Sequence, residues 1–475
     1  MRTNRTKTSR WFAGKSGFLF LLAFAVGITA FTACNKGTAQ GAAGDDPWQK
    51  ADSIMAAIKP PVFPDRDFLL TDYGAQGDGA TDCTGAFAAA IRACNEAGGG
   101  RVVVPAGKYL TGPIHLKSNV NLYLADSAEV LFSTDPDDYL PVVYTRFEGV
   151  EIMNYSPLIY AYEQENIAVT GSGTLNGQAD SLHWWPWKRK GSEDAGWQGP
   201  AIDSMKALAK NGVPVRERIF GKGSYLRPNF IQPYKCRNVL IENVTIRNSP
   251  MWVMNPVLCN NVTIQGVQVI SHGPNSDGCD PESSSNVLIA DCYFDTGDDC
   301  IAIKSGRDHD GRRVNVPSEN IIIRDCVMKD GHGGVVIGSE ISGSVRNVFA
   351  ENCRMSSPNL ERALRIKSNS YRGGIVENVF LRNIEVGEVS GAAIRINMFY
   401  SDERGSHFST VRNVLVQNMS CEKSEYAVRI EGEPAHPVEH IRIENSRFEN
   451  VKKANVAEGV EDLSLQNVRV NGEQL

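Results

Sequence analysis

A short pattern of polar and apolar positions recurs along the chain: an asparagine, then an apolar, a variable and another apolar residue. The alternation with period two predicts a short β-strand with one buried face. The copies begin at residues 166, 238, 261, 286, 320, 347, 378 and 413, and weaker copies begin at 440 and 462. From residue 238 onward the starts are 22 to 35 residues apart, which predicts one strand-bearing coil for each copy.

A second column lies six residues after each start from 238 onward and holds mainly small or medium apolar side chains. Its members are Val244, Val267, Cys292, Cys326, Cys353, Ile384, Met419, Ser446 and Val468. Such a column is typical of a buried stack, so we expect its cysteines to be free thiols and neither disulfides nor metal ligands. Coils of variable length with short strands and an asparagine at a fixed turn predict an all-β fold, a right-handed parallel β-helix. An Ala-rich amphipathic segment at 81–100, ended by glycines, predicts a helix that caps the N-terminal end.

One interval is much longer than a coil. From Asn166 to Asn238 the chain runs 72 residues, and the excess, residues 178–233, contains aromatic and basic stretches. Two interpretations are open: a surface excursion with a small core of its own, or a wall of a binding cleft whose Trp rings stack on sugars. We predict one β-helix domain over 61–475 that carries this insertion.

The first sixty residues predict targeting and tethering. Residues 1–33 combine a basic start with a short apolar stretch, which is typical of a signal peptide. Cys34 follows in TAFTACN, which resembles the lipobox of bacterial lipoproteins, where this cysteine carries the lipid. Residues 34–60 would then be the lipid-attached N-terminus and linker. We expect an outer-membrane or periplasmic lipoprotein of a Gram-negative bacterium; the alternative is an ordinary signal peptide with an incidental cysteine.

Reactive polar residues occupy similar positions on four successive coils. Each lies 12 to 20 residues after the start of its coil; they are Asp277, Asp298, Asp299, His332, Arg365 and Lys367. Neighbouring coils of a β-helix are about 4.8 Å apart, so these side chains should line one wall as a compact cluster. Each motif alone is more often a turn, a loop or a solvated pair. Their shared register is what predicts a site.

Three carboxyl groups, an imidazole and two cations suit hydrolysis of a bond between acidic sugars. One carboxyl group protonates the leaving oxygen, and crowding raises the pKa of one carboxyl so that it keeps a proton. Two carboxylates acting on one water predict inversion, with acid and base about 6.5–9.5 Å apart. Residues 300–374 hold 12 Lys or Arg against 8 Asp or Glu, a surplus that would attract a polyanion. The net charge of −6 for the whole chain argues against nucleic-acid binding.

In this order, the motifs NSDG, GDD, GHG and RIK resemble those of the polygalacturonase family, glycoside hydrolase family 28. The similarity runs over residues 66 to 450, and Ser276 is a conservative departure from the usual Thr. The resemblance implies an inverting hydrolase of α-1,4-galacturonosidic linkages in pectin that needs neither a metal nor another cofactor.

The resemblance also implies a role for each candidate residue. Asp298 would be the general acid, Asp277 and Asp299 would activate water, and His332 would hold or tune the acid. The substrate-binding residues would be Arg365, Lys367, Asn275 and Lys304.

The paired aspartates raise a local question, because strict alternation before Ile301 and Ile303 would turn one of them into the core. We predict that the chain bends at Gly297–Asp299, so that both carboxyl groups reach the cleft.

Other functions remain open at this stage. A calcium-dependent pectate lyase and a non-catalytic glycan-binding solenoid are the hypotheses of other classes. Within the hydrolase hypothesis we favour attack at a chain end, because the insertion could close one end of the cleft; rhamnogalacturonan or substituted pectin are alternative substrates. We expect a monomer whose contact with a membrane is through the lipid anchor.

Overall fold

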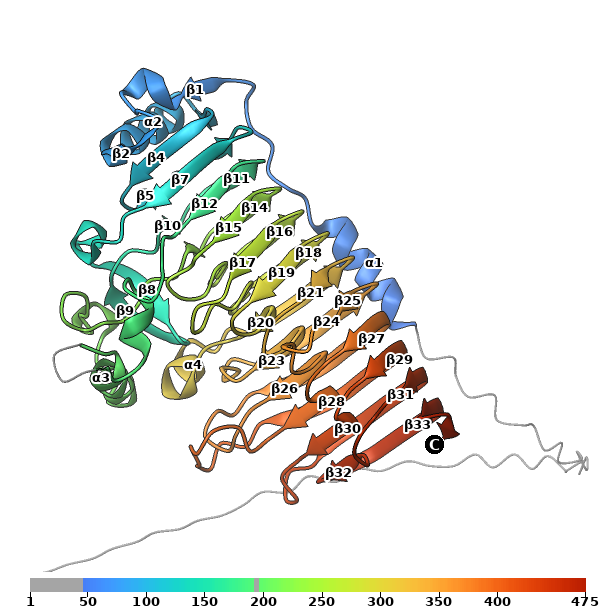
Figure 1. The fold of residues 1–475 in the computed structure, drawn as a ribbon. Helices are drawn as coiled ribbons and strands as arrows, with labels where there is room; N and C mark the ends of the chain where they lie inside the picture. Colours follow the sequence, from blue (N-terminus) through green and yellow to red (C-terminus); the bar gives the residue numbers. More distant parts are fainter. Residues whose placement is uncertain (1–45, 192–195) are drawn as a thin grey trace, which may run out of the picture. The chain divides into compact units, whose positions relative to one another are not determined.

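Parallel strands stack coil upon coil along most of the chain (Figure 1). The computed structural model describes residues 46–191 and 196–475. Two strand series lie in a 23-stranded sheet. The first is β3 (Gly100–Val104), β6 (Val120–Leu124), β11 (Glu165–Gly171), β14 (Arg237–Glu242), β16 (Asn260–Gln265), β18 (Ser285–Ala290), β21 (Ser318–Arg324), β24 (Val345–Glu351), β27 (Ile375–Glu388), β29 (Thr410–Lys423), β31 (Val438–Phe448) and β33 (Val460–Val470). The second is β4 (Gly107–Thr111), β7 (Ala128–Phe132), β12 (Thr174–Asn176), β15 (Thr245–Arg247), β17 (Gln268–Ser271), β19 (Tyr293–Thr296), β22 (Val327–Met328) and β25 (Arg354–Met355).

A six-stranded sheet completes the later coils. It consists of β20 (Ile301–Ile303), β23 (Val335–Gly338), β26 (Leu364–Lys367), β28 (Ala392–Asn397), β30 (Tyr426–Glu431) and β32 (Val456–Glu458). In the earlier coils its counterpart is β5 (Ile114–His115), β10 (Ile159–Tyr162) and β13 (Ile231–Tyr234). The right-handed parallel β-helix predicted from the repeat is confirmed.

The recurring asparagine has a conformational cause. Asn320 and Asn347 adopt left-handed backbone angles, with φ of 58° and 57°, which asparagine tolerates better than most residues. Their side chains also join the coils: Asn320 Nδ2 donates to Asn286 Oδ1 at 3.1 Å, and Asn347 Nδ2 donates to Asn320 Oδ1 at 3.0 Å. A second ladder, not predicted, runs five residues later, where Asn383 Nδ2 donates to Asn352 Oδ1 at 3.1 Å.

The column of small apolar residues faces the core as predicted. Cys292, Cys326 and Cys353 are each buried and free. All ten cysteines of the described residues are buried free thiols. The prediction that they act as small hydrophobic residues is confirmed.

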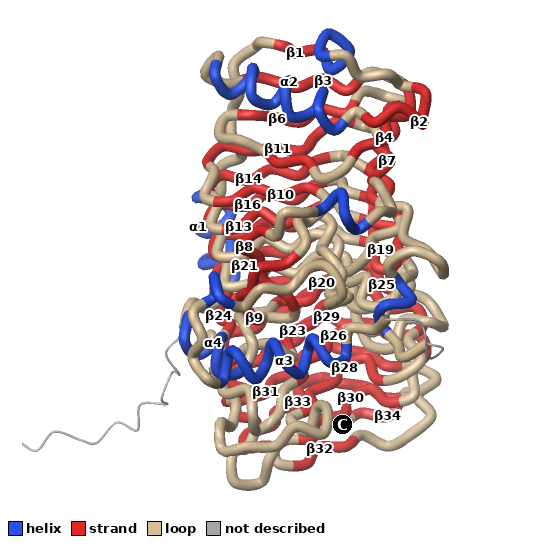
Figure 2. Tube along the Cα trace, turned by 90° about the vertical axis from the view of Figure 1, so that its left-hand side faces the viewer, coloured by secondary structure: helices blue, strands red, loops and turns tan. Residues whose placement is uncertain are grey.

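Helix α2 (Thr84–Glu96) lies across β1 (Asp67–Leu69), β3 and β6 at the N-terminal end of the solenoid (Figure 2). It buries Phe87, Ile91 and Cys94. The prediction of an N-terminal capping helix is confirmed. Between β1 and α2 lie the 3-10 helix η1 (Leu70–Tyr73) and β2 (Asp78–Asp82). At the other end β33 is closed by the short antiparallel β34 (Glu473–Gln474).

The folded domain begins before residue 61. Helix α1 (Pro47–Ala57) lies beside β18 and β21 and buries Trp48 and Ile54 against a cluster that includes Phe349. Burial of these side chains stabilises the helix on the sheet, so the prediction of a linker over 34–60 is wrong for residues 47–57. The predicted signal peptide, 1–33, and Cys34 lie outside the described residues. Within those residues no helix is long and apolar enough to cross a membrane.

Two excursions stand beside the coils. The predicted insertion leaves the solenoid after β12 and returns at β13; it contains η3 (Trp185–Lys188), α3 (Gly199–Lys210) and η4 (Val215–Glu217). The second, not predicted, is the antiparallel hairpin of β8 (Val143–Phe147) and β9 (Val150–Asn154), which contacts α3 and α4 (Asp308–Val314). A 3-10 helix, η2 (Pro136–Tyr139), precedes the hairpin.

The sequence of its turn could have predicted this hairpin. Its two-residue turn is Glu148–Gly149, and both residues have positive φ (41° and 83°), as a type I′ turn requires. A side chain at Gly149 would place Cβ 2.7 Å from the backbone nitrogen of Arg307. Glycine at this turn thus allows the hairpin to approach Arg307.

Candidate active site

The paired aspartates lie in the bend that joins β19 to β20. The chain turns at Gly297 and Asp298 and re-enters a strand at Ile301, so the predicted bend is confirmed. Asp277 lies on the preceding coil, where Cys279 pairs with Ile301. On the following coils His332 precedes β23, while Arg365 and Lys367 lie on β26.

The three carboxyl groups form one cluster. Asp277, Asp298 and Asp299 each offer an oxygen within 4.8 Å of the other two. Neighbouring coils bring these oxygens together because the rise between coils is about 4.8 Å. The expected separation of about 6.5–9.5 Å is therefore wrong for the nearest oxygens.

Asp299 is held beneath the surface by two cations. It is fully buried; Lys367 Nζ donates to its Oδ2 at 2.6 Å and Arg365 Nη1 donates to its Oδ1 at 3.2 Å. These two side chains were predicted to bind substrate, and here they hold a carboxylate of the protein. The prediction that both paired carboxyl groups reach the cleft is met by Asp298 alone, because Asp299 is drawn toward Lys367 and Arg365.

Asp298 is paired with the imidazole on the next coil. His332 Nδ1 lies 2.8 Å from Asp298 Oδ1. Burial would raise the pKa of Asp298, but the hydrogen bond to His332 and the charge of Lys367 outweigh it and hold the pKa below its ordinary value. The same hydrogen bond raises the pKa of His332.

Asp277 has the opposite electrostatic environment. Burial and the neighbouring charge of Asp298 raise the pKa of Asp277 well above its ordinary value. Its Oδ2 lies 3.5 Å from Lys304 Nζ, and its Oδ1 has no hydrogen-bond partner among the described residues. Crowding was expected to keep the proton on Asp298, but burial and the neighbouring charge favour the proton on Asp277 instead.

Lys304 and Asn275 are both engaged by the protein. Lys304 is buried, lies 4.6 Å from the ring centre of Trp252 and 3.5 Å from Glu340 Oε2. Asn275 Oδ1 accepts a hydrogen bond of 2.8 Å from Arg227 Nη2. Both residues nevertheless line the pocket that contains the aspartates.

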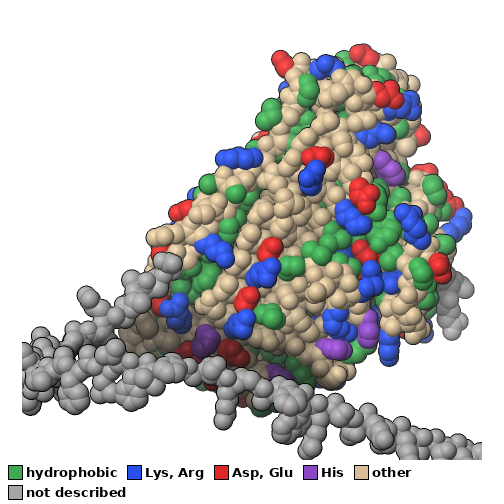
Figure 3. Space-filling model, turned by 180° about the vertical axis from the view of Figure 1, so that it is seen from behind, with side chains coloured by type: hydrophobic (Ala, Val, Ile, Leu, Met, Phe, Trp, Pro, Cys, Tyr) green, Lys and Arg blue, Asp and Glu red, His purple; other side chains and the backbone are tan. Residues whose placement is uncertain are grey.

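That pocket, called the catalytic pocket here, has a volume of about 370 Å³. Its acids and bases are Glu148, Asp277, Asp298, Glu340, Glu403, Lys188, Lys206, Lys304, Arg307, Lys367 and Arg372. Six cations thus face five acids, so the lining is closer to neutral than the local surplus of basic residues predicted. Elsewhere, Lys and Arg are interspersed with Asp and Glu over the face seen in Figure 3.

The insertion reaches the catalytic pocket through Lys188 and Lys206. Two of its tryptophans pack together: the buried Trp184 lies 5.0 Å from Trp187 between ring centres, and Trp187 in turn packs on Tyr225 at 5.3 Å. These rings extend the main hydrophobic core of the solenoid. A separate small core, as the first interpretation expected, includes Met205 of α3 and Leu226, and the interpretation of a cleft wall describes the two lysines.

Comparison with known proteins places this site in a family. The sequence profile of glycosyl hydrolases family 28 matches residues 220–410, which include every predicted catalytic residue. The chain is 31% identical over 407 residues to a probable polygalacturonase of Vitis vinifera, covering 81% of this chain and 74% of that protein. The chain belongs to glycosyl hydrolase family 28.

Two further proteins resemble the chain along most of its length. An exo-poly-alpha-D-galacturonosidase of Dickeya chrysanthemi is 28% identical over 83% of this chain and 69% of that protein. The crystal structure of a hyperthermoactive exopolygalacturonase from Thermotoga maritima is 49% identical, with a TM-score of 0.88 over 90% of this chain and 97% of that one. The protein is accordingly a glycoside hydrolase with the β-helix fold of this family.

Some pocket residues of this family 28 hydrolase escaped the sequence analysis. They are Glu148, Trp252, Arg307, Glu340, Arg372, Tyr400 and Glu403. Ser339 and Glu340 directly follow β23, in the coil of His332, so the register could have predicted them. Glu403 lies on a loop outside the repeated strands, so nothing in the sequence pattern indicated that it would reach the pocket.

The pairing of Asp298 with His332 predicts a measurable titration. Since the hydrogen bond to Asp298 raises the pKa of His332, its midpoint should lie above the ordinary value of about 6.5. The stabilisation that the charged imidazole contributes is fully present below pH 6.5 and is lost as the pH rises through the raised value. In Asp298→Asn the midpoint should fall, as measured by NMR titration of the histidines. His309, whose pKa burial lowers, is the internal control; an unchanged His332 would contradict the pairing.

Proposed function

We propose that this protein is an inverting, exo-acting polygalacturonase that hydrolyses α-1,4-galacturonosidic linkages of pectin from a chain end. The observation that carries hydrolysis is the carboxylate cluster in the catalytic pocket. Inversion is supported by the resemblance to the polygalacturonase family and not by the spacing of these carboxyl groups. Galacturonan is polyanionic, and the pocket places Lys188, Lys206 and Lys367 around Asp277 and Asp298. Two exo-acting relatives, from Dickeya chrysanthemi and Thermotoga maritima, support attack at a chain end.

In the proposed mechanism two carboxyl groups of the pocket act on opposite sides of the bond. The proton that burial favours on Asp277 first passes to Asp298, which leaves Asp277 ionised. Asp298 then protonates the leaving oxygen as the glycosidic bond breaks, and Asp277 removes a proton from the attacking water, whose oxygen bonds to the anomeric carbon. Asp299 adds a negative charge behind Asp277 and Asp298. Its ion pairs with Lys367 and Arg365 compensate that charge. His332 holds Asp298 in place.

Ion pairs between loops lie along one side of the catalytic pocket. Glu148, at the hairpin turn, accepts a hydrogen bond of 2.9 Å from Arg307. Lys206 of the insertion donates to Glu403 at 2.8 Å. Contacts across the pocket leave less room for a polymer to pass through than an open groove would, which supports binding of a chain end.

A product analysis on homogalacturonan tests the proposal. Exo-attack should release one short product from the earliest time points, with little loss of viscosity, and inversion should give the β-anomer first in the proton NMR spectrum. A ladder of medium oligomers would contradict exo-attack, and the α-anomer would contradict inversion. Ultraviolet absorbance of an unsaturated end that depends on calcium would support a lyase instead.

Rhamnogalacturonan belongs in the same assay as a second candidate substrate. A profile described as rhamnogalacturonase A/epimerase, pectate lyase-like, matches residues 69–125. That segment forms the N-terminal cap and first coils, whereas the catalytic pocket lies on later ones. We therefore expect faster hydrolysis of homogalacturonan.

We also propose that the protein is an exported lipoprotein anchored through Cys34, and that it is a monomer. The support is the signal-peptide pattern of 1–33 and the lipobox-like sequence that ends at Cys34. Labelling with a radioactive fatty acid should mark the wild type and not Cys34→Ser. Equal labelling of the two would contradict the anchor.

A further inference from the structure

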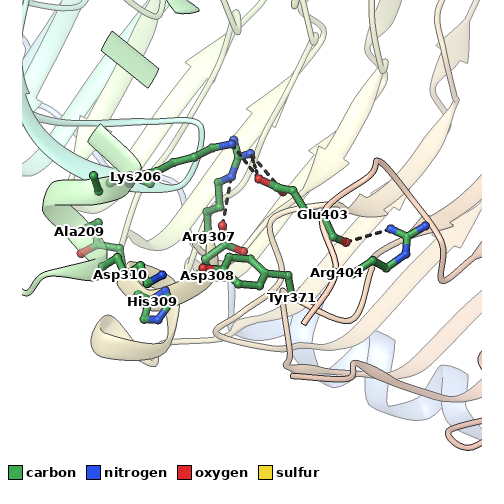
Figure 4. Close-up of a pocket in the computed structure, with 12 residues that line it drawn as sticks. Lys206, Ala209, Arg307, Asp308, His309, Asp310, Tyr371, Glu403 and Arg404 are labelled. Atoms are coloured by element: carbon green, nitrogen blue, oxygen red, sulfur yellow. Dashed lines mark hydrogen bonds and ion pairs between the residues drawn. The ribbon is translucent and has the colours of Figure 1, made fainter. Parts of the chain in front are cut away.

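A second pocket adjoins the catalytic pocket. It has a volume of about 250 Å³ and lies between the end of α3, the start of α4 and the loops that carry Tyr371 and Arg404 (Figure 4). The two pockets share Lys206, Arg307 and Glu403 in their linings. These three side chains therefore form a partition between the two spaces.

Ion pairs hold the partition together, and Glu403 is their centre. Its carboxylate accepts a hydrogen bond from Lys206 at 2.8 Å and one from Arg372 at 2.8 Å, and lies 3.4 Å from Arg307 Nη2. Burial would raise the pKa of Glu403, but the hydrogen bond of Lys206 and the charges of Arg307 and Arg372 lower it to about 2. The carboxylate is thus ionised at any pH at which the enzyme would work.

The second pocket has the chemistry of an acidic-sugar site. Lys210 and Arg404 line it, and neither has a carboxylate partner within 4.0 Å among the described residues. Arg404 Nη1 donates to the backbone oxygens of Ser401 at 2.6 Å and Glu403 at 2.9 Å. The aspartates that line it are already paired with arginines: Asp308 lies 2.7 Å from Arg372 and Asp310 lies 2.8 Å from Arg218. Cations without a carboxylate partner can bind the carboxylate of a ligand.

A ring platform completes the pocket. His309 packs edge-on against Tyr371, with 5.9 Å between ring centres and 60° between planes. Aromatic side chains in this setting offer an apolar surface to a pyranose, and the volume is of the order of one sugar residue.

We propose that Glu403 determines the length of the released product by keeping the second pocket separate from the catalytic pocket. With the partition in place, the chain end occupies the catalytic pocket alone and a single galacturonate is released at each hydrolysis. Without it, the chain end extends by one residue into the second pocket, and digalacturonate is released. The inference rests on the proposed exo-attack on galacturonan and adds the product length and the residue that sets it.

Removing the Glu403 side chain tests the assignment. Glu403→Ala opens the partition and frees Lys206, Arg307 and Arg372 to bind the carboxylate of a second sugar. The ratio of digalacturonate to galacturonate released from galacturonan should rise about tenfold or more, equivalent to one order of magnitude in relative binding. Glu403→Gln, which keeps the shape and loses the charge, should give a smaller rise and guards against misfolding of the alanine variant.

Two matched variants make the result specific. Asp402→Ala alters the adjacent exposed acid of the same loop and should leave the product ratio unchanged. Adding Lys210→Ala to Glu403→Ala should lower the digalacturonate fraction again, because Lys210 lies in the second pocket and not in the catalytic pocket. Chromatography of the early products, with thermal unfolding of each variant, measures both effects.

The outcomes separate this inference from the proposed function. An active wild type, together with a folded Glu403→Ala that still releases galacturonate alone, would overturn the inference and leave exo-hydrolysis intact. A ladder of longer oligomers from Glu403→Ala would show that the second pocket is open at its far side and would overturn the assignment of a single further sugar site. A wild type that does not act on galacturonan would overturn the proposed function and the inference together.

Discussion

Replacing Asp298 by asparagine should lower kcat on galacturonan by about 10²- to 10⁴-fold, the range expected for loss of a general acid. Asparagine keeps the size of the side chain but has no proton to give to the leaving oxygen. Substrate binding should change little, because the lysines around the pocket remain. Steady-state kinetics with reducing-sugar detection measures the effect.

A substrate with an activated leaving group discriminates between the two pocket carboxyl groups. An aryl α-galacturonide needs little protonation of its leaving oxygen, so Asp298→Asn should lose much less activity on it than on the polymer. Asp277→Asn should lose activity on both, because water must be activated in each case. The reverse pattern would exchange the two roles and would mean that the proton stays on Asp277, whose pKa burial raises.

Asp291→Asn is a suitable control for this experiment. Asp291 lies at the turn before β19, on the coil of Asp298, and has a φ of 54°, which asparagine adopts readily. The activity of Asp291→Asn should equal that of the wild type. A comparable loss in this variant would mean that the effect of Asp298→Asn comes from disturbance of the coil.

The second large effect should be on stability. Asp310→Asn should lower the free energy of unfolding by about 3–5 kcal/mol, as expected when one partner of a buried ion pair is removed. Asp310 is 1% exposed; its carboxylate lies 2.8 Å from Arg218 Nη1 and 2.9 Å from Arg313 Nε, and it accepts a hydrogen bond of 2.8 Å from the backbone of Glu151. It thereby joins α4 to the insertion and to the hairpin of β8 and β9.

The pH dependence of this effect has a definite sign. Burial would raise the pKa of Asp310, but the hydrogen bonds from Arg313, the Glu151 backbone and Arg218 outweigh it and lower the pKa. A lowered folded pKa means that the contribution is fully present above the unfolded value of about 3.9 and is lost as the pH falls through the folded value. The difference between wild type and Asp310→Asn should therefore persist at neutral pH and shrink below about pH 4.

Chemical denaturation at several pH values measures this difference. The exposed Asp203 on α3 provides a control, since Asp203→Asn should change the free energy of unfolding by no more than about 0.5 kcal/mol. A stability of Asp310→Asn equal to that of the wild type would show that the three elements are held together by their apolar contacts instead.

Sequence alone determined the solenoid and the neighbourhood of the catalytic groups. A β-helix repeats its turn at every coil, so asparagines such as Asn320 mark the register, and buried positions such as Cys326 follow at a fixed distance. Residues at matching positions on adjacent coils must then lie within one or two rises of each other. This is why the cluster of Asp277, Asp298 and His332 could be predicted without coordinates.

The tertiary structure alone decided which charged groups meet. The repeat places Asp298 and Asp299 side by side but cannot show that Lys367 and Arg365 hold Asp299 beneath the surface. Nor can it predict the ion pair between Lys206 and Glu403, which lie 197 residues apart on an insertion and a loop. Such loops follow no period, and their contacts depend on how separate excursions fold back over the coils. Register therefore located the site, while packing of the loops determined the ion pairs beside it and the charges that surround its acids.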